Sequence, residues 1–227
     1  MPEIDSRDYH DFVIRDGRLI GEFEQMYRKS ADIPWHQDEQ DDWMDVRLIT
    51  QLLKDYAPFD YICDLGCGLG YFLDILSSRV GRKGCRTVGY EMSKTCREKA
   101  GAIFPAMEFR HIDLMDAGSS TSQDKRKGNE KRLFCIRGTL WYVFPKIEET
   151  VLNASNKTEE GDIFLVSQNF PPLGSNYVGK DTIPDPEAII RLFGKYFEPL
   201  KSVFYEERLS SGNDNWFIAV FARRKNV

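Results

Sequence analysis

The residues with the clearest chemical meaning are an aspartate and three alternating glycines, in the segment 64–70 with the sequence DLGCGLG. Glycine has no side chain, so the backbone of such a segment can turn sharply and approach a ligand closely. Asp64 follows the apolar residues of a predicted strand, where a buried carboxylate is costly unless it has a partner. A ligand with a positively charged group would supply that partner, so the segment predicts a binding site for such a molecule.

Two predicted elements position the glycine segment. Tyr61 and Ile62 favour a strand, and apolar residues recur at helical spacing over 72–80. The free N–H groups and positive dipole at the start of that helix would suit a ligand carboxylate or phosphate. An ordinary strand–helix turn is the alternative. A dinucleotide-binding G-x-G-x-x-G fingerprint would need glycine at position 71, where the chain has Tyr71.

The glycine segment resembles the first motif, D-x-G-x-G-x-G, of the class I S-adenosylmethionine-dependent methyltransferases. The resemblance covers about residues 35–225. It implies a methyltransferase enzyme whose cofactor is S-adenosyl-L-methionine. Within the motif, the implied cofactor contacts are Asp64, Gly66, Cys67, Gly68 and Gly70.

Acidic residues at the next two strand ends extend the predicted cofactor site. Glu91 ends the second predicted strand, where a carboxylate can accept hydrogen bonds from both ribose hydroxyls. Met92 follows it and is predicted to pack on the adenine ring. The resemblance implies that Asp113, at the end of the third strand, accepts a hydrogen bond from the adenine amino group and that the Leu114 backbone contacts the ring. The alternative is that Asp113 only caps its loop.

The end of the fourth predicted strand is less regular, with the sequence RGTLWY over 137–142. Gly138 is predicted to contact the methionine portion of the cofactor through its backbone. Trp141 and Tyr142 are predicted to bound the site of methyl transfer, although two aromatic residues near a helix start are often core residues. Arg137 is predicted to pair either with an anionic substrate group or with Asp64.

The first 42 residues are predicted to form an extension that closes over the cofactor as a lid, before a cofactor-binding domain over 43–227. Trp35 is predicted to contact the cofactor. His36 is the favoured general base, with Tyr142 as the second catalytic residue, because histidine titrates near neutral pH. His111 lies within a strand pattern, and His10 is expected to be remote.

A second, shorter resemblance concerns the acceptor. Met26-Tyr27 followed by Pro34-Trp35 is similar to bacterial methyltransferases that act on sugars, including nodulation-factor N-methyltransferases. It implies that the acceptor is a small molecule, a hydroxyl or amine of a saccharide or of a saccharide-linked compound.

Strand and helix patterns alternate from about residue 43, which predicts an α/β fold. Among them are a third strand over 107–114 and a helix that begins at Pro145. With the resemblance, we expect a doubly wound, mostly parallel, seven-stranded Rossmann-like sheet. The runs 200–209 and 215–223, joined by a turn over 210–214, are predicted to end it as an antiparallel hairpin.

Composition narrows the function further. The chain has 227 residues and a formal net charge of −5, which disfavours a nucleic-acid partner. We expect no membrane span, no metal site, and reduced cysteines in a cytoplasmic protein. The competing hypotheses are an NAD-dependent oxidoreductase and a non-catalytic cofactor-binding module. The oligomeric state cannot be inferred from the sequence.

Overall fold

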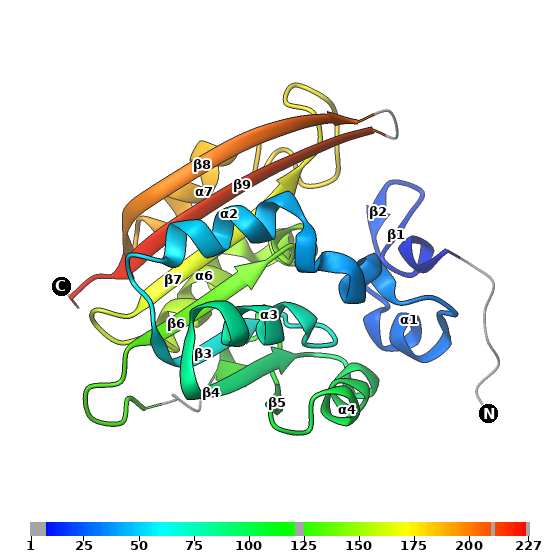
Figure 1. The fold of residues 1–227 in the computed structure, drawn as a ribbon. Helices are drawn as coiled ribbons and strands as arrows, with labels where there is room; N and C mark the ends of the chain where they lie inside the picture. The colour runs from blue at the N-terminus through cyan, green and yellow to red at the C-terminus, as the bar shows by residue number, and fades with distance from the viewer. Residues whose placement is uncertain (1–7, 121–124, 210–211, 226–227) are drawn as a thin grey trace.

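The computed structural model describes residues 8–120, 125–209 and 212–225. A seven-stranded sheet with the order β5-β4-β3-β6-β7-β9-β8 runs through the molecule (Figure 1). Its strands are β3 (Phe59–Leu65), β4 (Gly81–Glu91), β5 (Glu108–His111), β6 (Arg132–Arg137), β7 (Ile163–Phe170), β8 (Phe197–Leu209) and β9 (Gly212–Arg223). The strands β3 to β7 pair in parallel, and β9 pairs antiparallel with both β7 and β8. This arrangement confirms the predicted fold class.

Helices cover both faces of the sheet because residues alternate between its two sides. Along β3, Tyr61, Cys63 and Leu65 point into one apolar cluster and Ile62 into the other. The first cluster packs against α6 (Ile147–Asn156) and α7 (Pro186–Phe193), and the second against α2 (Met44–Leu53) and α3 (Tyr71–Val80). The remaining helix beside the sheet, α4 (Lys94–Ile103), begins at Ser93, whose hydroxyl accepts a hydrogen bond from the Cys96 N–H at 3.1 Å.

Several predicted boundaries were wrong. The third strand, expected over 107–114, is only β5, because this edge strand pairs with β4 no further than His111. Pro145 does not begin an α-helix. It lies in the 3-10 turn η4 (Phe144–Lys146), between the short helix α5 (Leu140–Val143) and α6. Of the predicted hairpin turn, Ser210 and Ser211 lie outside the described residues, and β9 begins at Gly212.

The described part of the N-terminal extension forms a small unit beside the sheet (Figure 1). It contains η1 (Tyr9–Phe12), β1 (Ile14–Arg15), β2 (Arg18–Leu19), α1 (Phe23–Lys29) and η2 (Pro34–Asp42). Glu24 of α1 accepts hydrogen bonds from the Ser93 hydroxyl at 2.7 Å and the Thr95 N–H at 3.1 Å. Burial opposes ionisation of Glu24, but hydrogen bonds from the Thr95 hydroxyl, together with these two and one from Arg28, lower its pKa to about 2. An ionised Glu24 therefore fastens the extension to the start of α4. The division into a lid and a domain at residue 42 stays a prediction.

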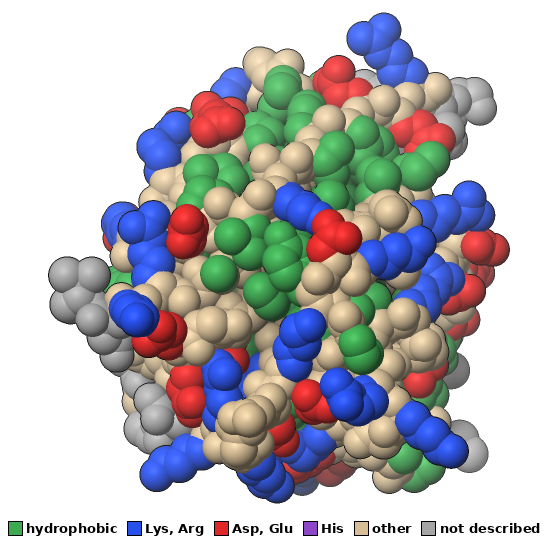
Figure 2. All heavy atoms as spheres, turned by 60° about the vertical axis from the view of Figure 1, so that its left-hand side comes forward, with side chains coloured by type: hydrophobic (Ala, Val, Ile, Leu, Met, Phe, Trp, Pro, Cys, Tyr) green, Lys and Arg blue, Asp and Glu red, His purple; other side chains and the backbone are tan. Residues whose placement is uncertain are grey.

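Three findings concern membranes, the charge of the surface and metal ions. Within the described residues, no helix has the length and apolar character needed to cross a membrane. On the face drawn in Figure 2, basic and acidic side chains are interspersed around apolar ones, so this face carries no extended basic surface. In the part of the chain that the structure describes, no group of three His, Cys, Asp or Glu residues is arranged to hold a metal ion.

Candidate functional site

A cavity of about 670 Å³ lies beyond the carboxyl ends of β3, β4 and β6, where the strand order changes direction. Its other side is formed by the N-terminal extension. The volume is in the range typical of small-molecule sites. It is lined by most of the residues predicted for the site, which are Trp35, His36, Asp64, Gly66, Cys67, Gly68, Glu91, Met92, Asp113, Leu114, Arg137, Gly138 and Tyr142.

The glycines of the 64–70 segment are required by the backbone. Gly66, Gly68 and Gly70 have φ values of 87°, 54° and 90°, in the left-handed region that favours glycine. A Cβ atom on Gly66 would also lie 2.6 Å from the Thr139 hydroxyl. Gly70 does not line the cavity. It forms the N-cap of α3, and a Cβ atom there would lie 2.8 Å from the Phe109 ring. Gly70 therefore has a packing role, and its contact with the cofactor stays a prediction.

Three N–H groups of the glycine turn, which precede the start of α3, already have acceptors within the protein. The Gly68 N–H donates to Glu91 Oε2 at 3.2 Å, and the Leu69 N–H donates to Gln37 Oε1 at 2.8 Å. The Gly70 N–H donates to the Cys67 carbonyl at 3.0 Å. An anionic ligand group would have to displace a protein acceptor from each of these donors.

Asp64 is buried at the end of β3, with 2% of its surface exposed. Its Oδ1 atom has no hydrogen-bond partner within the described structure. Burial raises the pKa of Asp64 to about 7, although Cys135 and the charge of Arg137 act in the opposite direction. A buried carboxyl oxygen without a partner, at the edge of a cavity, is suited to a ligand that carries a hydrogen-bond donor or a positive charge.

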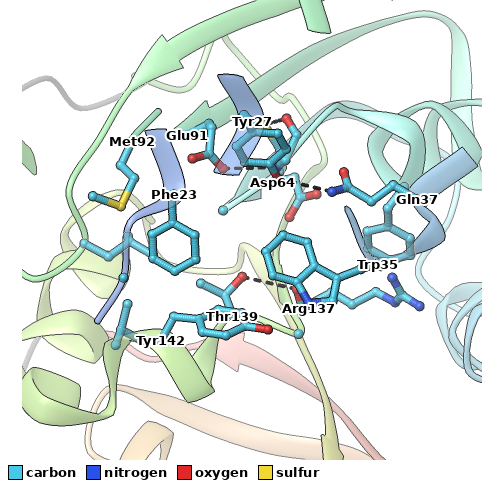
Figure 3. A pocket seen from close by; sticks show the side chains of 18 of the residues that line it. Phe23, Tyr27, Trp35, Gln37, Asp64, Glu91, Met92, Arg137, Thr139 and Tyr142 are labelled. Carbon is cyan, nitrogen blue, oxygen red and sulfur yellow. Dashed lines mark hydrogen bonds between the residues drawn. The ribbon is translucent and has the colours of Figure 1, made fainter. Parts of the chain in front are cut away.

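Glu91, at the end of β4, is buried and lines the same cavity. It accepts hydrogen bonds from the Gly68 N–H at 3.2 Å and the Ser93 N–H at 2.9 Å. Burial raises its pKa despite these two bonds. Figure 3 shows Glu91 and Met92 on one side of the open space, with Asp64 nearby. A carboxylate offers about four acceptor positions, so Glu91 keeps accepting capacity for a ligand donor.

Asp113 caps its loop, as one alternative expected, and its contact with adenine stays a prediction. Its Oδ1 accepts a hydrogen bond from the Met115 N–H at 2.9 Å, so Asp113 caps its own loop. The residue also lines the cavity beside Leu114. Loop capping uses one carboxylate oxygen and leaves the other for a ligand.

Arg137 does not pair with Asp64 as one alternative expected. Its Nε donates to Asp45 Oδ2 at 2.7 Å, and its Nη1 donates to Gln40 Oε1 at 2.7 Å. The guanidinium also lies 4.8 Å from the centre of the Trp216 ring. The sequence analysis missed Asp45, which is fully buried in α2. The signal for Asp45 in the sequence was a charged residue within an apolar helical pattern before β3. A carboxylate buried there needs a cationic partner.

The sequence analysis also missed Gln37, which joins the extension to the glycine turn. Besides accepting from the Leu69 N–H, its Nε2 donates to the Tyr27 hydroxyl at 3.1 Å. The two preceding residues, Trp35 and His36, have φ values of 55° and 46°. This conformation costs a non-glycine residue roughly 1–2 kcal/mol, so the surrounding contacts must maintain it. No sequence pattern marks such positions.

The histidines are not placed as expected. His10 was predicted to be remote, but it lines the cavity, and its Nδ1 lies 2.7 Å from Asp8 Oδ1. His36 also lines the cavity and is exposed, with its Nδ1 3.9 Å from Glu39 Oε2, which is too long for a hydrogen bond. His111 is exposed at the end of β5 and does not line the cavity. Of the three histidines, the two in the extension therefore line the cavity.

The two aromatic residues after β6 have different surroundings. Tyr142 lines the cavity, and burial raises the pKa of its phenol well above the usual value, so it stays protonated at neutral pH. Trp141 does not line the cavity. Its Nε1 donates to the Asn169 carbonyl at 2.7 Å, and its ring packs against Phe170 and Tyr177. Trp141 thus has a packing role, because consecutive helical residues point in different directions, and its place at the site of methyl transfer and its contact with the cofactor stay predictions.

Comparison with known proteins gives structural relatives only. No family model and no curated protein sequence matches the chain. The N-methyltransferase NodS from Bradyrhizobium japonicum, solved with S-adenosyl-L-homocysteine, is 12% identical, with a TM-score of 0.63 over 86% of this chain and 93% of that one. Geranyl diphosphate C-methyltransferase from Streptomyces coelicolor is 14% identical, with a TM-score of 0.56 over 78% of this chain and 77% of that one.

The chain has the fold of the S-adenosylmethionine-dependent methyltransferases. The [4+2]-cyclase SpnF has a similar structure, with 12% identity and a TM-score of 0.59 over 80% of this chain and 82% of that one. Because a methyltransferase-like fold also occurs in a cyclase, the reaction of this chain has to be argued from its own residues.

Proposed function

We propose that the protein is an S-adenosylmethionine-dependent methyltransferase that acts on a hydroxyl or amine of a small molecule. The observation that carries this proposal is Asp64, a buried carboxylate whose Oδ1 has no hydrogen-bond partner in the described structure. Glu91 and Asp113, at the ends of the next two strands, line the same cavity. Together they offer three acceptor groups to one ligand.

These residues fit the cofactor. Asp64 would hold its α-ammonium group, Glu91 its ribose hydroxyls, and Asp113 its adenine amino group. Arg137, fixed by Asp45 and Gln40, would provide positive potential for its carboxylate. When bound, S-adenosylmethionine supplies an electrophilic methyl group on a positively charged sulfur. The contribution of the protein is to align the acceptor, exclude water and accept a proton.

An NAD-dependent oxidoreductase is supported less well. The cofactor of such an enzyme carries a diphosphate, which usually binds to free N–H groups of the glycine turn. Here Glu91 Oε2, Gln37 Oε1 and the Cys67 carbonyl accept from three N–H groups of that turn. The carboxylates of Asp64 and Glu91 would also repel a diphosphate. A non-catalytic cofactor-binding module is the other alternative.

Isothermal titration calorimetry tests the cofactor directly. We expect S-adenosylhomocysteine to bind with a Kd on the order of micromolar, about −8 kcal/mol, and NAD to show no binding at 1 mM. Binding of NAD without binding of S-adenosylhomocysteine would contradict the proposal. Binding of S-adenosylhomocysteine without methyl transfer to any acceptor would support the non-catalytic alternative.

The acceptor predicted from the sequence is a saccharide hydroxyl or amine. The support for it is the short resemblance around Tyr27 and Trp35, together with a cavity whose polar side chains include His10, His36 and Asn169. Aromatic side chains can also pack against the less polar face of a sugar ring. The saccharide stays a prediction, and the aromatic residues that line the cavity favour a different acceptor, as argued in the next subsection.

For the general base, the geometry favours His10 over His36. Asp8 Oδ1 lies 2.7 Å from His10 Nδ1. This contact would orient the imidazole ring and leave its Nε2 atom to receive a proton. We expect His10→Gln to slow methylation of a hydroxyl acceptor by about 100-fold, and His36→Gln by less than threefold. The measurement is the rate of S-adenosylhomocysteine formation with each acceptor of a hydroxyl panel. Equal rates for His10→Gln and the native protein would exclude His10 as the general base. A loss of methylation rate in His36→Gln alone would support His36, the base predicted from the sequence.

A further inference from the structure

The end of the cavity formed by the extension is bounded by connected aromatic rings. The Tyr9 and Trp35 ring centres lie 5.7 Å apart, those of Trp35 and Tyr142 5.6 Å, and those of Phe23 and Tyr142 5.3 Å. All four residues line the cavity, and we call them the aromatic wall. Figure 3 shows Phe23, Trp35 and Tyr142 around the open space that Asp64 and Glu91 also face. The wall therefore shares one open space with the strand-end carboxylates.

Charged groups are distributed unevenly in this cavity. Its carboxylates, Asp64, Glu91 and Asp113, lie at the strand ends. Among the described lining residues, the one Lys or Arg is Arg137, which is bound to Asp45 and Gln40. An acceptor with a phosphate or carboxylate would meet no Lys or Arg at the wall, although such groups are normally bound by these residues.

A positively charged acceptor is also disfavoured. Aromatic rings attract cations, but a protonated amine has no lone pair with which to attack a methyl group. The cofactor of the proposed function already brings a positive sulfur to the same cavity. The rings of the wall instead provide flat apolar surface, which favours a flat apolar partner through offset or edge-to-face packing. Leu19 and Ile20 extend this apolar surface.

We infer that the acceptor is an uncharged compound with a planar, largely apolar ring system that carries a hydroxyl or neutral amine. The inference rests on the proposed function. The ring system packs against the aromatic wall and presents its nucleophilic atom to the strand ends. A lone pair of that atom forms a bond to the methyl carbon as the carbon–sulfur bond breaks and leaves its electron pair on sulfur. The acceptor proton passes to water or to a histidine.

A matched pair of probes tests the inference. Protein saturated with S-adenosylhomocysteine is titrated with 2-naphthol, 2-naphthyl phosphate and methyl glucoside in a calorimeter. We expect 2-naphthol to bind at least tenfold more tightly than either of the others. Equal or tighter binding of the phosphate or the glucoside, or no binding of 2-naphthol, would overturn the inference. Failure of S-adenosylhomocysteine to bind in the first step would instead refute the proposed function.

Two variants locate the probe at the wall. Phe23→Ala should weaken 2-naphthol binding about tenfold, and by more than it weakens S-adenosylhomocysteine binding. Ile20→Lys adds a cation at an exposed lining position and should strengthen 2-naphthyl phosphate binding about tenfold. The matched control is Ile103→Lys, at an equally exposed position of α4 that does not line the cavity, where no change is expected. Identical affinities in Ile20→Lys and Ile103→Lys would place the probe elsewhere and overturn the inference.

Discussion

Asp64→Asn is expected to weaken S-adenosylhomocysteine binding at least tenfold at pH 8, about 1.4 kcal/mol, while leaving the protein more stable. The substitution keeps the shape of the side chain but removes the negative charge that would hold the α-ammonium group. In the ligand-free protein that charge is buried, and its Oδ1 has no partner within the described structure. Calorimetric titration and thermal unfolding measure the two effects on the same samples.

The pH dependence of the same site gives a second readout. Burial raises the pKa of Asp64 to about 7 in the free protein, so the carboxyl is mostly protonated at pH 6 and mostly ionised at pH 8. Because the α-ammonium group requires the ionised form, affinity should fall about tenfold from pH 8 to pH 6. In Asp64→Asn this dependence should disappear.

Stability should change in the opposite direction. A carboxyl whose pKa is raised by folding adds most stability below its ordinary pKa and loses that contribution as the pH rises through about 7. The asparagine side chain does not ionise, so the Asp64→Asn variant does not lose stability in this way. The Tm of the variant should therefore exceed that of the native protein at pH 8 by at least about 3 °C. The control is Asp74→Asn, an equal charge change at an exposed position of α3. A lower Tm together with native affinity would show that Asp64 is a structural residue.

The sequence was sufficient to predict the sheet and the strand-end carboxylates because both depend on local patterns. Alternating apolar runs mark strands, and in a parallel sheet the acids that follow successive strands meet at one edge. Asp64, Glu91 and Asp113 therefore came together in the cavity as expected. Their roles toward a ligand stay predictions.

The rest of the site depends on contacts between distant segments, which a single sequence does not reveal. Arg137 meets Asp45 only after α2 has packed on the sheet, and Gln37 meets the Leu69 N–H only after the extension has packed beside it. The same packing brings His10 to the cavity. Trp141 and Tyr142 could not be told apart because a short helix determines which of two neighbouring rings faces the cavity.

Glu91→Gln is expected to weaken S-adenosylhomocysteine binding by about tenfold to 100-fold, since a hydrogen bond to a charged group contributes about 1.5–3 kcal/mol. The substitution also places an amide NH₂ among the Gly68 and Ser93 N–H groups that Glu91 now accepts from, so some loss of stability will accompany it. Loss of affinity alone would not separate these two effects.

A ligand pair separates the ribose contact of Glu91 from its structural role. The native protein should bind S-adenosylhomocysteine at least tenfold more tightly than the 2′-deoxyribose analogue, because Glu91 would accept from both ribose hydroxyls. In Glu91→Gln this preference should fall to threefold or less, which is the non-additivity expected for groups in direct contact. Glu98→Gln, an equal charge change at an exposed position of α4, should keep the full preference. A preference that survives in Glu91→Gln would mean that Glu91 only braces the glycine turn and that another residue recognises the ribose.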